Sequence, residues 1–355
     1  MDRYIGLDAH ASSCTLAVID SRGKRLGSSV VATTAPTLIE AVRAIRGRRH
    51  LALEEGTLAG WLYEVLTPEV NDLVVAAVPE SRGPKSDERD AFHLADELRT
   101  GGIKRTVYKA RGGYAALGYQ AKVYARLVSD SVRVMLRLKS LFRSRGVFVR
   151  GDTGYSLGGR RAWIAQLPPA ARPAVALCYA ELDALLAVRA QAATARLAEA
   201  RHHPVWRLVR TCPGLGPIRS ALLIPIVVTP ARFRSKRAFW SYCGLGLVTR
   251  SSADWVRTAS GHWVRARVPL TRGLNPTCHR TLKYLFKSAA VTVIRRAADE
   301  PLYRHYQALL AGGTKPNLAA LTIARQLATI VLALWRTGAR YDPRQLERRI
   351  AMRPA

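Results

Sequence analysis

The sequence predicts an α/β domain at the N-terminus, then a long helical segment, then a mainly α-helical C-terminal domain. Three observations predict this order. Short apolar runs separated by turn residues occupy residues 3–78, and apolar residues at helical spacing dominate 111–145 and 174–202. The charge balance also changes, because residues 1–100 carry 12 Lys and Arg against 15 Asp and Glu, whereas residues 101–355 carry 44 against 10.

The N-terminal domain, which we place at residues 1–105, begins with three predicted strands. They span residues 3–8, 14–20 and 24–32, with a turn at Asp20-Ser21-Arg22-Gly23 between the second and the third. There follow a helix opened by Pro36, a strand at 50–54, a helix from Leu58 to Val65, a strand at 73–78, and a helix that follows Pro84 and ends at Gly101-Gly102. An antiparallel three-stranded meander followed by alternating helices and strands is the RNase H-like order.

Four acidic residues occupy positions typical of metal ligands in such a domain. Asp8 ends the first strand and Glu54 ends the fourth, with Glu55 as the neighbouring alternative. Asp87 and Asp90 lie three residues apart at the start of the last helix, so their carboxylates face the same way. Each residue alone is common at a strand end or a helix N-terminus. The ordered set indicates a site for two hard cations, the usual apparatus for displacement at a phosphodiester.

The formal net charge of +31 indicates a polyanionic partner, and nucleic acid is the obvious one. A membrane role is not expected, since the sequence has no segment of about 20 uninterrupted apolar residues. Five scattered cysteines form no Cys-x-x-Cys pair, and Met1-Asp2-Arg3 leads directly into a strand without a signal peptide. We therefore expect a reduced, cytoplasmic protein.

Residues 106–203 are expected to form a coiled-coil segment of two long helices that pair with each other or with a partner subunit. The first helix has an apolar seam composed of Ala121, Tyr124, Val128, Met135, Leu138 and Phe142. Another face carries the basic residues Lys122, Arg126, Arg133 and Arg137. This stripe is either a solvated surface or a phosphate-binding face, and the scarcity of acids makes the two interpretations about equally good.

The C-terminal domain is placed at residues 204–340, with a basic tail at 341–355. Its clearest element is a helix-hairpin-helix-like turn containing Gly214 and Gly216 between two apolar helical patterns. Such a turn presents backbone N–H groups to a DNA phosphate, and the nearby Arg219 favours that function over a plain interhelical turn. Further along, Ser251 and Ser252 follow a Gly-Leu segment, where serines are ordinarily turn residues.

Taken together, five motifs resemble insertion-sequence transposases of the IS-one-hundred-ten family. The motifs are Tyr4-Ile5-Gly6-Leu7-Asp8, Glu54-Glu55-Gly56-Thr57, the Lys85–Ala91 segment with its Asp-x-x-Asp pair, the Cys212-Pro213-Gly214-Leu215-Gly216 turn, and the Gly244-Leu245 segment that ends in Ser252. The resemblance spans roughly residues 3–335. It implies a RuvC-like domain whose tetrad Asp8, Glu54, Asp87 and Asp90 binds Mg²⁺, joined to a serine-bearing transposase domain.

The same resemblance implies a mechanism and partners. Ser252 would attack DNA and form a phosphoserine link, with the adjacent Ser251 as the alternative nucleophile. Arg272 would replace a family lysine as a phosphate contact. A non-coding guide RNA would pair with the donor and target DNA, and sites would be shared between protomers of a homodimer or tetramer. The protein would then be a bacterial, nucleoid-associated recombinase of a mobile element, with the long helices as dimerisation and RNA-binding elements.

Other interpretations remain open from the residues alone. A RuvC-like structure-specific endonuclease would use the tetrad to activate water and would not need Ser252. An actin-like sugar kinase also has a Gly-Leu-Asp strand before a hairpin, but the strong positive charge disfavours it. A non-catalytic nucleic-acid-binding protein would tolerate Asp87→Asn.

Overall fold

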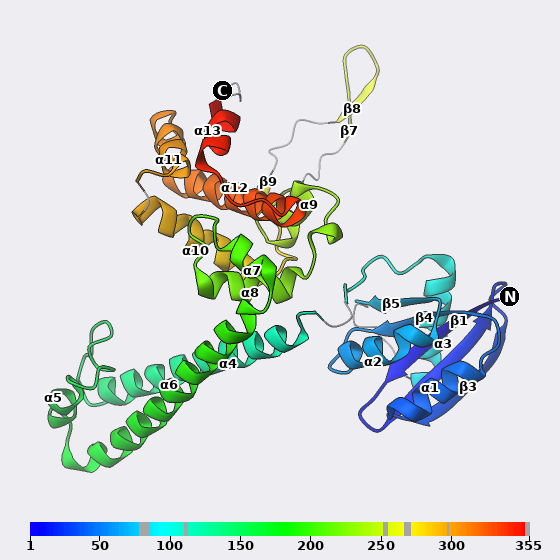
Figure 1. The fold of residues 1–355 in the computed structure, drawn as a ribbon, viewed down its shortest axis with the longest axis horizontal. Coiled ribbons are helices and arrows are strands. Elements are labelled where there is room, and N and C mark those ends of the chain that lie inside the picture. The colour runs from blue at the N-terminus through cyan, green and yellow to red at the C-terminus, as the bar shows by residue number, and fades with distance from the viewer. Residues whose placement is uncertain (78–85, 110–112, 251–254, 266–270, 297, 352–355) are drawn as a thin grey trace. The chain divides into compact units, whose positions relative to one another are not determined.

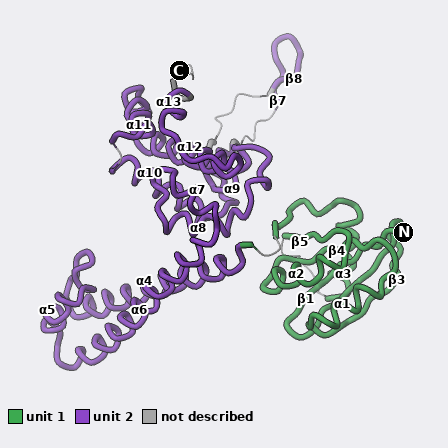
Figure 2. The backbone as a smooth tube through the Cα atoms, in the orientation of Figure 1, with its two compact units in different colours: residues 1–113 green, residues 114–355 purple. Residues whose placement is uncertain are grey.

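The structure, a computed structural model, describes residues 1–77, 86–109, 113–250, 255–265, 271–296 and 298–351. The chain folds as two units, residues 1–113 and residues 114–355 (Figure 2). The first boundary lies eight residues after the predicted one at 105. The predicted division of the second unit at residue 203, and the separate tail from 341, stay predictions.

The first unit is built on a mixed five-stranded sheet (Figure 1). Its elements are β1 (Asp2–Ala9), β2 (Ser13–Asp20), β3 (Arg25–Ala32), α1 (Ala35–Ala44), β4 (Arg48–Glu54), α2 (Ala59–Leu66), the 3-10 turn η1 (Thr67–Glu69), β5 (Asp72–Ala76) and α3 (Asp87–Thr100). The strand order is β3-β2-β1-β4-β5, with β1, β2 and β3 antiparallel and β1, β4 and β5 parallel. This sheet with its helices fits the predicted RNase H-like fold.

The two faces of this sheet are covered by different helices. Leu38 of α1 and Leu62 of α2 pack on Ile5, Leu7 and their neighbours on one face. On the other face, Ala91 and Ala95 of α3 pack with Ala17 and Ile19 of β2, and Leu94 packs with Ala52 and Ala76. Side chains alternate between the two faces along a strand, so consecutive residues pack against different helices.

The second unit begins with two long helices, α4 (Ala115–Arg143) and α6 (Arg172–Arg201), which pack along each other. Leu117 near the start of α4 packs beside Ala200 near the end of α6, while Phe142 packs with Val175, so the pair is antiparallel. The short α5 (Arg160–Ala165) and η2 (Pro169–Ala171) connect them. The predicted pairing within one chain is therefore present, and the apolar seam is buried at Ala121, Leu138 and Phe142.

Two buried arginines, one in α5 and one in α6, are accommodated differently. Arg160 is 8% exposed and forms a two-pronged ion pair with Asp183, at 2.5 and 2.7 Å. Arg196 is 1% exposed and has its guanidinium carbon 4.0 Å from the centre of the Tyr124 ring. Burial lowers the pKa of Arg196. The ring face supplies the attraction that a carboxylate supplies to Arg160.

The rest of the second unit is a helical bundle with two small β elements. Its helices are α7 (Pro204–Val209), α8 (Pro217–Val227), η3 (Pro230–Arg232), α9 (Lys236–Tyr242), α10 (Arg280–Arg296), α11 (Pro301–Ala311), α12 (Pro316–Thr337) and α13 (Pro343–Ala351). α7, α8, α11 and α12 each have proline in the first turn, where its missing N–H costs no helical hydrogen bond. Within the described residues, α12 is long and apolar enough to cross a membrane. Because its residues Ile323, Leu327 and Val331 are buried in the core of this unit, packing accounts for its apolar character.

The strands of this unit form two two-stranded ribbons. β6 (Leu247–Arg250) pairs with β9 (Thr271–Leu274), and β7 (Trp255–Arg257) pairs with β8 (Trp263–Arg265), both antiparallel. The β7–β8 hairpin is thus inserted in the sequence between β6 and β9, the two strands of the first ribbon (Figure 1).

Candidate active site

Two of the predicted ligands end neighbouring parallel strands. β1 and β4 pair with Gly6 opposite Ala52 and Leu7 opposite Leu53. Asp8 and Glu54 are the next residue on each strand, so they leave the sheet at the same edge. Leu7 and Leu53 are buried on the face covered by α1 and α2. By alternation, Asp8 and Glu54 belong to the face covered by α3.

A close approach between β1 and α3 brings Asp87 to this edge. A Cβ atom at Gly6 would lie 1.8 Å from the carbonyl oxygen of Ala91 and 2.8 Å from the nitrogen of Ala95. Only glycine leaves room for the helix backbone there. Asp87 is one helical turn before Ala91 and therefore on the same side of α3. Its carboxylate is carried toward the end of β1, where Asp8 lies.

The side chains of Asp8, His10 and Asp87 meet at this point. His10 Nε2 lies 3.3 Å from Asp8 Oδ2 and 3.4 Å from Asp87 Oδ2. One ligand atom of each of the three residues lies within 4.8 Å of the others. The Asp8 side chain is 20% exposed and the Asp87 side chain 58% exposed, so the group is open to solvent and to a substrate. Two carboxylates and an imidazole at this spacing can hold one divalent cation.

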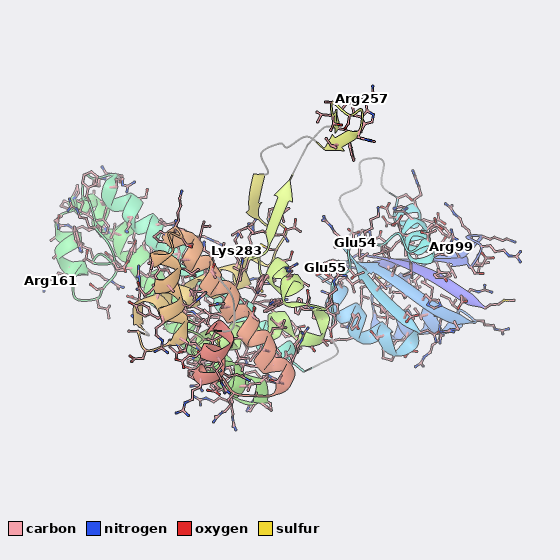
Figure 3. All side chains as sticks on the ribbon, turned by 90° about the horizontal axis from the view of Figure 1, so that it is seen from above. Glu54, Glu55, Arg99, Arg161, Arg257 and Lys283 are labelled. Atoms are coloured by element: carbon pink, nitrogen blue, oxygen red, sulfur yellow. The ribbon has the colours of Figure 1, made fainter. Side chains whose placement is uncertain are left out.

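Asp90 and Glu54 lie on the side of the site formed by β4, the strand next to β1. Asp90 is one turn before Leu94, and Leu94 packs on Ala52 of β4. The helix phase therefore directs Asp90 toward β4. Glu54 is the last residue of this strand (Figure 3). Neither residue is part of the compact group of ligand atoms formed by Asp8, His10 and Asp87.

The choice between the two adjacent glutamates has a structural basis. Glu55 forms an ion pair with Lys109 at 2.8 Å, and its backbone N–H donates to the carbonyl of Ala76. Glu55 thus ties the end of β4 to β5 and to the segment after α3. Glu54 stays the proposed ligand, because it lies on the face of the sheet that α3 covers.

Ser251 and Ser252 lie outside the described residues, but the ribbon that carries them is described. They follow Arg250 directly at the end of β6, whose partner β9 has Arg272 opposite Thr249. The side chain of Arg272 is not among those described. The base of the ribbon is held by Asn275, whose amide Nδ2 donates to Ser241 Oγ at 2.9 Å and whose N–H donates to Gly246 O.

A positive φ fixes the turn before β6. Gly244 has φ +66°, and a Cβ there would lie 2.5 Å from Cys278 Sγ and 3.0 Å from Lys283 Cδ. The Gly244-Leu245 turn is therefore packed against the start of α10. Nearby, burial lowers the pKa of His279, and the positive charge of Arg232 lowers it further. Burial raises the pKa of the Cys243 thiol, which makes it an unreactive core residue.

The predicted nucleic-acid contacts have varied environments. Lys122, Arg126, Arg133 and Arg137 are all exposed along one face of α4. Arg133 pairs with Asp130 at 3.3 Å, and Arg137 pairs with Glu181 at 2.8 Å. Two of the four cations in the stripe are thus paired with neighbouring acidic side chains.

The turn with Gly214 and Gly216 lies between α7 and α8, and Gly214 has φ +73°. Arg219 donates to Gly214 O at 2.7 Å and to Ser288 O at 3.3 Å. Its guanidinium therefore fastens the turn to α10.

Two family models match the chain. One, the DEDD transposase model of IS110 elements, matches residues 5–145, and the other, described as the transposase IS116/IS110/IS902 family, matches residues 206–307. The chain belongs to the IS110 family of transposases. No curated protein matches it.

It is consequently an enzyme that acts on DNA in transposition and recombination. The first match contains the whole carboxylate edge, and the second contains the turn, the β6–β9 ribbon and α10. This membership removes the sugar-kinase and non-catalytic interpretations, and a DEDD transposase domain suggests the use of a divalent metal.

The sequence places His10 near the predicted metal site without requiring it as a ligand, and in the structure its Nε2 lies within 3.4 Å of a carboxylate oxygen of both Asp8 and Asp87. The signal was its position two residues after Asp8. β1 ends at Ala9, so His10 directly follows the strand, and residues two apart along an extended backbone point to the same side.

Proposed function

We propose that the chain is an RNA-guided DNA recombinase in which Ser252 is the nucleophile and the carboxylate edge of the first unit supplies metal-assisted catalysis. The observation that supports this most is the meeting of Asp8, His10 and Asp87 at the end of β1, beneath the Asp-x-x-Asp turn of α3. The family's serine motif follows β6 in the second unit. Glu54 and Asp90 complete the proposed tetrad.

In the proposed chemistry, Ser252 Oγ forms a bond to the phosphorus of a DNA phosphodiester. The bond from phosphorus to one deoxyribose oxygen breaks, the serine proton leaves to a base, and the released oxygen takes up a proton as a hydroxyl. A hydroxyl of another strand then attacks the phosphoserine and regenerates the serine. Because each step exchanges one phosphate ester for another, no ATP is needed. Ser251 is the alternative nucleophile.

The residues present fit a divalent cation, and the cation we propose is Mg²⁺. Asp8, Asp87, Glu54 and Asp90 offer carboxylate oxygens, the donors that Mg²⁺ prefers. When bound, the cation would stabilise the charge that develops on the phosphate. The protein's own contribution is to hold Asp87 over Asp8 through the glycine contact of β1 with α3.

The proposed partners are donor and target DNA ends, a non-coding guide RNA, and further copies of the chain in a homodimer or tetramer. Guide pairing would supply sequence selectivity. The protein would contact the nucleic-acid backbones through residues 114–355, which contain 40 Lys and Arg but only 10 Asp and Glu. We propose the exposed stripe on α4 as one such contact surface. Recombination would take place in the bacterial cytoplasm, at the nucleoid.

A recombination assay in cells tests this proposal. The wild type would be compared with Asp8→Ala, Ser252→Ala and Ser251→Ala, using the element's flanking DNA and a target plasmid, and protein–DNA adducts would be sought on denaturing gels. We expect loss of recombination for Asp8→Ala and Ser252→Ala, and an adduct that requires Ser252. An adduct that survives Ser252→Ala but not Ser251→Ala would transfer the role to Ser251.

A second candidate is a RuvC-like structure-specific endonuclease. It is favoured by one observation, that Asp8, His10 and Asp87 come together within the first unit alone. Cleavage of branched DNA that continues in Ser251→Ala/Ser252→Ala and yields no adduct would establish this function and end the serine proposal.

A further inference from the structure

A groove of about 870 Å³ lies on the second unit between α10 and α12, beside the end of the Gly214–Gly216 turn. Its cationic residues are Arg219, Arg280, Lys283 and Lys287, and Tyr284 and Asn317 also line it. In the part of the chain that the structure describes, no Asp or Glu lines this groove. Its volume lies within the roughly 300–1,000 Å³ of pockets that enclose small organic ligands, so a nucleotide fits.

The groove follows from the amphipathic pattern of α10. Leu282, Leu285, Phe286, Ala289 and Val293 are buried in the core of the unit. The remaining positions Arg280, Tyr284, Lys287 and Val291 recur at spacings of four, three and four residues, which places them in one exposed stripe. The helix contains five Lys and Arg and no acid. Its outer face therefore carries positive charge that no acid of the same helix offsets.

The cations of the groove lack acidic partners near them. Among the described residues, Arg280, Lys283 and Lys287 form no ion pair, in contrast to Arg133 and Arg137 of the α4 stripe. Like charges gathered around one concavity repel one another, and an anion placed there relieves that repulsion. The groove therefore fits a phosphate-bearing ligand.

An aromatic side chain narrows the class of ligand. Tyr284 is 74% exposed and Val291 41% exposed, so the cationic surface includes an uncovered ring and an aliphatic side chain. Duplex nucleic acid presents phosphates but keeps its base faces stacked inside. Single strands offer both phosphates for cations and base faces for aromatic rings.

We propose that this groove binds a single-stranded segment of nucleic acid, with phosphates at Arg280, Lys283 and Lys287 and a base stacked on Tyr284. Lys283 also contacts the Gly244 turn that leads into β6 (Figure 3). A nucleic-acid strand bound here would therefore extend to the base of the β6–β9 ribbon, in which Ser251 and Ser252 directly follow β6 in the sequence. The inference rests on the family's action on DNA and not on the proposed roles of Ser252 or the carboxylates.

Fluorescence anisotropy with the full chain in EDTA tests the proposal apart from any catalysis. The probes are labelled single-stranded DNA, single-stranded RNA and duplex DNA of about 15 nucleotides, since single-strand-binding domains typically cover roughly 4–16 nucleotides. Lys283→Glu/Lys287→Glu is compared with Arg295→Glu/Arg296→Glu, which makes the same charge change in the last turn of α10, where the residues are exposed and outside the groove. We expect the groove variant to weaken single-strand binding at least about tenfold more than its control.

Tyr284 provides the second arm. Tyr284→Ala is expected to weaken single-strand binding about tenfold and duplex binding little, whereas Tyr284→Phe keeps the ring and binds as the wild type does. Because the side chain is largely exposed, neither substitution threatens folding. A loss with DNA, with RNA or with both supports the proposal and identifies the source of the strand.

Two results would overturn the proposal. Equal losses in the groove variant and the Arg295/Arg296 control would show general charge attraction and no groove. A groove variant that loses duplex binding, with no effect of Tyr284→Ala on single strands, would make this a duplex-phosphate surface. Either result leaves the proposed serine chemistry untouched, since that is read from adducts.

Discussion

The carboxylate edge of the first unit and the cationic groove of the second are opposite in charge but built in the same way. In the first, Gly6 lets the backbone of α3 approach at Ala91, and the helix carries Asp87 to Asp8. In the second, Gly214 lies against the backbone of α10 at Ala289, where a Cβ would be 2.6 Å from the carbonyl oxygen. α10 then presents Lys283 and Lys287 to the groove.

The difference between the two regions lies in how their charges are balanced. Residues 1–113 contain 16 Lys and Arg against 15 Asp and Glu, and the acids of the edge have His10 between them. Residues 114–355 contain 40 against 10, and α10 contributes none of the ten. The first region suits a small cation within a near-neutral unit, whereas the second suits a polyanion. In both regions a glycine lies against a helix that carries the charged side chains, and those side chains differ in sign.

The largest expected effect is the loss of chemistry when a carboxylate of the edge is neutralised. Asp87→Asn keeps the shape but removes the charge that would hold a cation, so strand cleavage should fall roughly 10²- to 10³-fold or more. The matched control is Asp96→Asn on the same helix, whose carboxylate pairs with Arg99 at 2.6 Å outside the site. Single-turnover cleavage in Mg²⁺ measures both. Equal activity of the two variants would remove Asp87 from the site.

The glycine contact that positions this edge can be broken directly. Gly6→Ala forces a methyl group into the Ala91 carbonyl, so we expect a loss of about 1–3 kcal/mol or more in the free energy of unfolding. Gly27→Ala on β3 meets no atom within 4 Å and serves as the control. Urea denaturation gives both values. A Gly6→Ala variant as stable as the control would show that α3 does not depend on this close approach.

The groove should determine the salt dependence of binding, and the carboxylate edge should not. Lys283→Ala/Lys287→Ala removes two phosphate contacts, which should reduce the slope of log affinity against log salt by about 1.4 for a single strand. Asp87→Asn, measured by the same titration in EDTA, should leave the slope unchanged. A reduced slope in Asp87→Asn as well would mean that the two regions do not act separately.

Much of the first unit could be predicted from the sequence, because alternating apolar runs and turn residues are local signals. The succession of strands and helices along the first unit agrees with the prediction, and the ligand roles of Asp8 and Asp87 stay predictions. The role of Gly6 could not be predicted from the sequence, because the residue that requires glycine there is Ala91, which is distant along the chain. The position of His10 near Asp8 could be expected from the sequence, whereas its contact with Asp87 depends on how α3 packs.

The groove was harder to predict than the α4 stripe, although both are basic helix faces. Four cations on α4 are evident by spacing, but the acid that neutralises Arg137, Glu181, lies on α6. Three of the five Lys and Arg on α10 line the groove, and their importance depends on Arg219 from another helix and on α12 as the opposite wall. Tertiary packing thus decides which basic stripe is left unbalanced.

A smaller effect concerns the pH dependence of the second unit's stability. Burial and Arg232 lower the pKa of His279 in the folded chain, whereas the unfolded chain has the ordinary value of about 6.5. The unfolded state therefore binds a proton more readily, and stability is lost as the pH falls below about 6.5. His279→Gln should flatten this decline by a few degrees in thermal midpoint between neutral and mildly acidic pH. Parallel profiles for the two proteins would contradict this sign.

The smallest effect separates two arginines of the α4 stripe. Arg126 forms no ion pair among the described residues, whereas Arg133 pairs with Asp130 at 3.3 Å. If the stripe contacts phosphates, Arg126→Ala should reduce the salt slope of duplex DNA or guide RNA binding by about 1. Arg133→Ala should reduce it less, because Asp130 already offsets part of the positive charge of this arginine. Salt titrations of the two variants provide the test. Equal and negligible changes would mark α4 as a solvated surface, and the groove on α10 would then be the stronger of the two basic surfaces.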